Sequence, residues 1–154
     1  MSSGFLADKF QAAQYEARTA RVSLPILADF FPEGEEPAFT VRGLTASELN
    51  KAIEAGMRRK AIDAVAQAIA TQKEEIAGVR AALGLSKETP GEIAKRLEML
   101  VLGAVEPVVS HATAAKLAEI APVEFYELTN RITELTAQGG SRVKRQPSSQ
   151  ATPD

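Results

Sequence analysis

Cysteine and tryptophan are absent from this 154-residue chain, and aromatic residues make up only 5% of it. Without cysteine the chain has no disulfide framework, no thiolate metal site and no thiol nucleophile. So few aromatic side chains favour closely packed helices with a core of Ala, Leu, Ile and Val over an aromatic-lined pocket. The formal net charge of -2 gives no overall field that would attract nucleic acid or an anionic membrane.

Long hydrophobic runs are missing as well. The longest wholly apolar stretch, Met99 to Val105, is far shorter than the roughly 20 residues that span a bilayer. The N-terminal sequence MSSGFLADKF has no basic flank followed by an apolar core, so it is not typical of a signal peptide. We therefore expect no membrane association and a cytoplasmic location.

The length is that of one domain with a hydrophobic core, flanked by two different ends. Residues 1–20 form an N-terminal segment in which the apolar residues of Phe5–Arg18 follow a helical spacing. Residues 21–138 form the folded domain. Residues 139–154 are a polar tail without apolar periodicity, which predicts disorder.

The folded domain begins with two segments of strand-like alternation. The first covers Arg21–Leu27, where Pro25 lacks an amide donor and confines the strand to a sheet edge. The second covers Phe39–Gly43. An acidic loop with two prolines and a glycine separates them, so we expect a small hairpin that needs helix packing for stability.

Helical signals occupy the rest of the domain. Thr45 and Glu48 fit a capping box, and an alanine-rich stretch without proline follows as far as Leu83. A second helix begins at Pro90 and is apolar nearly all round, which predicts burial until Pro107 stops it.

The last two helices are expected over Thr113–Ile120 and from Pro122 onward. The final helix carries one apolar stripe, formed by Phe125, Leu128, Ile132 and Leu135. The predicted fold class is therefore mostly α: a helical bundle with a long alanine-rich helix, a small N-terminal β-hairpin and a disordered C-terminal tail.

The long helix carries the sequence feature with the clearest functional meaning. Apolar residues there follow alternating steps of three and four, as in a coiled coil. The stripe consists of Ile62, Val65, Ile69, Ile76, Val79 and Leu83. It either packs inside the monomer or binds a partner or a second copy, and the spacing alone leaves both readings open.

Other candidate sites are weak. His111 is the only histidine, and nothing places carboxylates beside it, so a surface position is expected. The acidic cluster at 29–36 lacks the fixed spacing of a calcium loop. The basic run 58–60 points in three directions on a helix. No phosphate loop or serine elbow is present, so we expect no enzyme, no cofactor and no metal site.

The order of elements resembles the tail assembly chaperones of long-tailed bacteriophages and prophages. The resemblance rests on a strand that leads into a Leu-Thr-x-x-Glu helix start, on an acid-Pro step after a hydrophobic helix, and on a last helix of the form Phe-x-x-Leu-x-x-x-Ile-x-x-Leu. Here these are Leu44, Thr45 and Glu48, then Glu106-Pro107, then Phe125, Leu128, Ile132 and Leu135. The match covers roughly residues 20 to 137, and the middle between Asn50 and Lys87 matches no motif.

The resemblance implies a non-enzymatic protein that binds the tape measure protein during tail morphogenesis and is absent from the mature virion. It also implies a homo-oligomer and, in many members, a longer form made by ribosomal frameshifting. Gly139-Gly140 is encoded by adjacent GGN codons that would suit such a site, although a glycine helix cap explains the pair equally well. A slippery heptamer in the nucleotide sequence there would support frameshifting.

Two other classes of function remain open from the sequence. One is a small helical regulatory protein that binds a host factor at fixed stoichiometry. The other is a weak DNA-binding protein, with Arg58, Arg59, Lys60 and the tail as its contacts.

Overall fold

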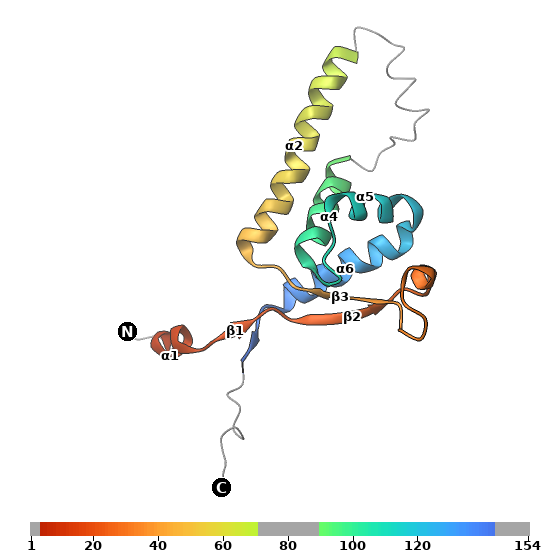
Figure 1. Ribbon diagram of the computed structural model, residues 1–154. Helices are drawn as coiled ribbons and strands as arrows, with labels where there is room; N and C mark the ends of the chain where they lie inside the picture. The colour runs from red at the N-terminus through yellow and green to blue at the C-terminus, as the bar shows by residue number, and fades with distance from the viewer. Residues whose placement is uncertain (1–3, 71–89, 144–154) are drawn as a thin grey trace.

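The computed structural model describes residues 4–70 and 90–143, which are drawn as ribbon in Figure 1. The mostly α prediction is confirmed. Five α-helices are present in these ranges: α1 Ala7–Ala12, α2 Ala46–Ala70, α4 Pro90–Gly103, α5 His111–Ile120 and α6 Pro122–Gln138. The remaining elements are β1 Tyr15–Glu16, β2 Thr19–Ser23, the 3-10 helix η1 Pro25–Phe30, β3 Ala38–Arg42, β4 Ala104–Glu106 and β5 Ser141–Arg142.

The predicted hairpin is confirmed, because β2 and β3 pair antiparallel from Thr19 opposite Arg42 to Ser23 opposite Ala38. The predicted strand end at Leu27 is wrong, since η1 begins at Pro25. A proline suits the first turn of a helix, where its missing amide would have no partner. This turn directs Leu27 inward, and its amide donates to the Leu24 carbonyl at 2.9 Å.

A third strand, β4, was not predicted and replaces the expected continuation of the second long helix to Pro107. Helix α4 ends at Gly103, and β4 pairs antiparallel with β3, with Val41 opposite Ala104 and Thr40 opposite Glu106. Strand β3 is thus central in a sheet of order β2-β3-β4. The residue before a proline favours extended backbone, which suits Glu106 as a strand residue. The Glu106-Pro107 peptide bond is cis.

Helices α4, α5 and α6 gather on one side of this small sheet, and the core lies between the two layers (Figure 1). Strand β3 contributes Phe39 and Val41 to the core, and Leu24 joins them directly after β2. The predicted apolar stripe of α6 is confirmed, because all four of its residues are buried in the core: Phe125, Leu128, Ile132 and Leu135. Among the described helices, none has the length and apolar character that a membrane span requires.

Both ends of the chain differ from expectation. The helix predicted over Phe5–Arg18 is only the six residues of α1, and the chain then enters β1. Strand β1 pairs with β5, and the Val143 amide donates to the Gln14 carbonyl at 2.8 Å. The predicted start of a disordered tail at residue 139 is therefore too early, because backbone pairing continues past the glycine cap of α6. Residues 144–154 lie outside the described residues.

Candidate partner-binding surface

The structure describes only part of the predicted coiled-coil stripe. Ile62 and Val65 lie on α2 with 61% of each side chain surface exposed, so neither is part of the monomer core. Ile69 also belongs to α2. The predicted positions that lie outside the described residues are Ile76, Val79 and Leu83. The structure thus favours an exposed role for the two stripe residues whose surroundings it describes.

Two further apolar residues extend this exposed surface toward the start of α2. Ile53 is 39% exposed and Met57 is 63% exposed. They are four residues apart and so lie on the same side of the helix. At about 100° per residue, Met57, Val65 and Ile62 lie within about 140° around the helix. We call this broad exposed side the outer face of α2; Ile53 lies at its edge, about 180° from Ile62.

The opposite side of α2 is buried by a close crossing with α4. Ala52 and Gly56 are buried there, and a Cβ atom built on Gly56 would lie 2.7 Å from the carbonyl oxygen of Gly91. In the same way, a Cβ atom built on Gly91 would lie 2.7 Å from the carbonyl oxygen of Gly56. Because Gly91 is the second residue of α4, the later turns of α2 extend past the start of α4, as Figure 1 shows. The crossing therefore fixes α2 with its outer face turned away from α4.

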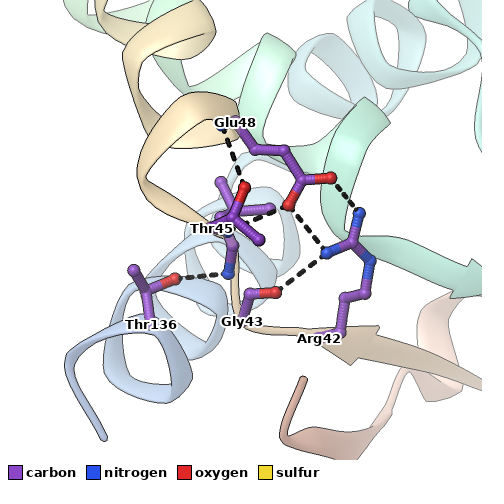
Figure 2. A network of polar contacts seen from close by, with 6 residues as sticks. Arg42, Gly43, Thr45, Glu48 and Thr136 are labelled. Carbon is purple, nitrogen blue, oxygen red and sulfur yellow. Dashed lines mark hydrogen bonds and ion pairs between the residues drawn. The ribbon is translucent and has the colours of Figure 1, made fainter. Parts of the chain in front are cut away.

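The start of α2 is held by a polar network at the end of β3 (Figure 2). The predicted capping box is confirmed: the Glu48 amide donates to the Thr45 hydroxyl at 3.2 Å, and the Thr45 amide donates to the Glu48 carboxylate at 3.0 Å. The Arg42 guanidinium donates to both carboxylate oxygens of Glu48, at 2.9 and 2.6 Å. This fork was not predicted, although an arginine six residues before the capping glutamate was visible in the sequence.

A second anchor joins the same junction to α6. The Leu44 amide donates to the Thr136 hydroxyl at 2.9 Å, and a Cβ on Gly43 would lie 2.9 Å from the backbone of Leu135 (Figure 2). Both contacts reach the last turn of α6, where Leu135 of the buried stripe and its neighbour Thr136 lie. The direction in which α2 leaves the sheet is therefore set by the cap, the Arg42 fork and the packing of Gly43 against α6.

The Arg42 fork makes the stability of this junction depend on pH. Hydrogen bonds from Arg42, together with those at Thr45, lower the pKa of Glu48 from 4.5 to about 2. A carboxylate with a folded-state pKa below its unfolded value stabilises the fold above the unfolded pKa and loses that contribution as pH falls toward the folded one. Ionised Glu48 thus contributes fully above pH 4.5, and the contribution disappears toward pH 2.

Replacing Glu48 by Gln is expected to lower the free energy of unfolding by about 1 kcal/mol at neutral pH, a discounted value because the pair is partly exposed to solvent. The difference from wild type should shrink as the pH is lowered through the acid range. Urea unfolding followed by circular dichroism at several pH values measures it. Glu127→Gln, at an exposed position of α6, removes the same charge and should cost less than about 0.5 kcal/mol. Equal stability of the Glu48 variant and wild type at neutral pH would contradict the role of the fork.

The basic run of α2 does not form one patch. Successive helical residues point about 100° apart. Lys60 lies over α4, since a Cβ on Gly91 would be 2.6 Å from its Cγ atom. Arg58 and Arg59 are exposed at other angles of the helix. The three cations therefore do not present the single basic surface that phosphate binding along a duplex favours.

The remaining candidates are surface features. His111 is the first residue of α5, which begins two residues earlier than predicted because the Ser110 side chain caps it. Its Nε2 atom lies 2.8 Å from a carboxylate oxygen of Glu98, and its side chain is 68% exposed. In the acidic loop, Glu36 accepts a hydrogen bond from Arg21 at 3.2 Å. Within residues 4–70 and 90–143, no three His, Cys, Asp or Glu side chains are grouped so that they could hold a metal ion.

Comparison with known proteins does not identify the chain. No protein-family model, curated protein or solved structure matches it. The resemblance to phage tail assembly chaperones therefore remains a prediction from the motifs. The outer face of α2 is an exposed helical surface whose direction is set by the α4 crossing and the Arg42 junction.

Proposed function

We propose that this protein is a tail assembly chaperone of a long-tailed bacteriophage or prophage. It binds the tape measure protein in the host cytoplasm during tail morphogenesis, self-associates, and catalyses no reaction. The observation that carries the proposal is the outer face of α2, where Met57, Ile62 and Val65 are each exposed by 61% or more. Neighbouring apolar side chains that stay exposed on a folded domain favour a protein–protein contact.

The surface suits a helical partner in its chemistry. A long tape measure helix with apolar stripes would aggregate if nothing covered it. Exposed aliphatic and methionine side chains on a helix bind the apolar face of another helix, and Ala61 and Ala64 between them allow close approach. Many copies along one long helix add many weak contacts, which gives high avidity while each copy stays removable.

The motifs behind the resemblance also bear on this surface. Thr45 and Glu48 cap α2, and Leu44 is buried beside them. These are the residues of the Leu-Thr-x-x-Glu helix start, so this part of the resemblance concerns the junction that orients the outer face. A frameshifted longer form belongs to the same proposal. Gly139 has a φ of 77°, which a glycine cap of α6 also explains, so only the codons at Gly139-Gly140 bear on it.

Replacing Ile62 and Val65 together with Asp is expected to weaken capture of the tape measure protein by at least about tenfold, because two carboxylates would be buried in an apolar contact. The chain should be co-expressed with the tape measure protein of the same genome and recovered by affinity purification. Helicity of the purified variant should stay close to wild type by circular dichroism, since both side chains are exposed.

Arg131→Asp is the matched control. It changes the net charge by the same two units at a surface position of α6, away from the outer face of α2, and capture should be unchanged. Undiminished capture by the Ile62 and Val65 variant would exclude the outer face as the binding site. Loss of helicity in that variant would show that the two residues are core. Capture of a single globular host protein at fixed stoichiometry, with no capture of the tape measure protein, would favour the regulatory alternative.

A further inference from the structure

The aromatic residues are distributed unevenly, and the distribution points to a second contact. The chain has six phenylalanines and two tyrosines. One pair lies on α6, and the other six residues form two clusters near opposite ends of β2. The cluster before β2 contains Phe5, Phe10 and Tyr15, and the cluster after it contains Phe30, Phe31 and Phe39.

Phe5 and Phe10 of the first cluster lie on what we call the arm, residues 4–13, which includes α1, and Tyr15 follows in β1. Helix α1 has no buried residue, and Phe5, Leu6 and Phe10 are 54–64% exposed. The rings of Phe5 and Phe10 lie 5.5 Å apart, and those of Phe10 and Tyr15 lie 5.9 Å apart. Figure 1 shows the arm projecting away from the helical layer. Three large apolar side chains are thus grouped on a segment with no core to cover them.

The second cluster lines a groove between η1, the start of β3 and α5. The groove has a volume of about 480 Å³, within the range of about 300–1,000 Å³ that is common for binding pockets. The large apolar side chains in its lining are Leu27, Phe30, Phe31, Phe39, Leu117 and Ile120. Phe30 is 78% exposed and Ile120 is 54% exposed at its mouth. The groove therefore offers an open apolar site for large side chains.

We infer that the arm of one copy of this chain docks in the groove of a second copy. Its own groove is out of reach for two reasons. Only two residues, Ala13 and Gln14, separate α1 from β1, and β1 is paired with β5. The groove is lined by η1, which follows the other end of β2, and Figure 1 shows α1 and the segment after β2 near opposite ends of the sheet.

The chemistry of the two surfaces matches. Phe5 and Phe10 bring aromatic rings to a site that Phe30, Phe31 and Phe39 surround, and aromatic pairs are favourable beyond the area they bury. The arm carries Asp8 and Lys9, and the charged lining of the groove is Arg21, Lys116, Glu35, Glu36 and Glu106, so both surfaces hold charges of both signs. The C-terminal residues 144–154 include no aromatic residue and no aliphatic residue larger than alanine, so they fit the site poorly.

This contact joins two different surfaces, so it closes a reciprocal dimer or continues into a ring or helical row of copies. It uses neither Ile62 nor Val65, which belong to neither the arm nor the groove lining. It stands on the arm and groove alone and does not depend on which protein α2 binds.

Two variants and their mixture test the contact by analytical ultracentrifugation over a concentration series. Phe10→Glu disables the arm, and Ile120→Glu disables the groove. Each variant alone should sediment as a single chain of 16.4 kDa, with self-association weakened by at least about tenfold. An equimolar mixture should form a two-chain complex, because one intact arm and one intact groove remain.

Controls keep charge and position matched. Gln11→Glu adds the same charge on α1 without removing a ring, and Val123→Glu changes a residue that is 66% exposed beside the groove helix but does not line the groove. Both should associate like wild type. Because the chain has no native cysteine, Phe10→Cys and Ile120→Cys variants mixed under oxidising conditions should form one disulfide between copies.

Three results would overturn the inference. One is a wild-type chain that is monomeric at every concentration. The second is a mixture of the two variants that stays monomeric. The third is an Ile120→Glu variant that self-associates like wild type but no longer captures the tape measure protein. That result would mean that the groove binds the tape measure protein and not the arm of a second copy. Failure of the Ile62 and Val65 test with arm-dependent association intact would reject the proposed function and leave this contact standing.

Discussion

Replacing Phe125 by alanine is expected to lower the free energy of unfolding by about 3–5 kcal/mol. Phe125 is 1% exposed and lies in the core between the sheet and the helices. Its ring meets the ring of Tyr126 edge to face, with centroids 5.7 Å apart and an interplanar angle of 85°. Truncation removes this contact and leaves a cavity that the surrounding helices fill only in part.

Urea unfolding followed by circular dichroism measures this loss. Val123→Ala on the same helix is the control, since Val123 is 66% exposed and its truncation should change the free energy by less than about 0.5 kcal/mol. Similar small effects for both variants would mean that the α6 stripe does not cover the core. The contrast also matters for function, because it shows which apolar side chains the monomer already uses.

The sequence predicted those parts of the fold that depend on neighbouring residues. The capping box of Thr45 and Glu48 is a contact over three residues. The proline start of α6 and its stripe are likewise local patterns, and the hairpin of β2 and β3 joins adjacent segments. In each case the amino acids that decide the structure lie within one element or two consecutive ones.

The missed parts depend on partners far along the chain. Strand β4 exists because β3, more than sixty residues earlier, offers it backbone groups, and the sequence of Ala104–Glu106 reads equally well as a helix end. The pairing of β1 with β5 joins the two ends of the chain. Short strands carry too little alternation to be recognised without such a partner.

The candidate surface shows the same limit. The stripe on α6 and the stripe on α2 have similar apolar spacing, yet Ile132 is fully buried and Ile62 is 61% exposed. Spacing gives the side of a helix on which apolar residues gather, and only the packing of the other elements decides whether that side is covered. On α2 the close crossing at Gly56 buries the opposite side of the helix against α4, and the side with Ile62 therefore stays exposed.

Replacing Gly56 by alanine is therefore expected to lower the free energy of unfolding by about 1–3 kcal/mol. The added Cβ would lie 2.7 Å from the Gly91 carbonyl oxygen and 3.2 Å from the Cβ of Lys95. Because the nearest atom belongs to the backbone of α4, the two helices must move apart. In a free helix the same substitution would stabilise by about 1 kcal/mol, since alanine is the better helix former.

The sign of the change is thus the result to measure, again by urea unfolding. Ala64→Gly, at an exposed position of the same helix, gives the propensity term alone and should cost about 1 kcal/mol. A stabilised Gly56 variant would mean that α2 does not pack closely on α4, and Met57, Ile62 and Val65 would then lose their fixed outward direction. A destabilised Gly56→Ala variant would support close packing of the inner side of α2 on α4. The outer face of α2 is then the side that remains available to a partner.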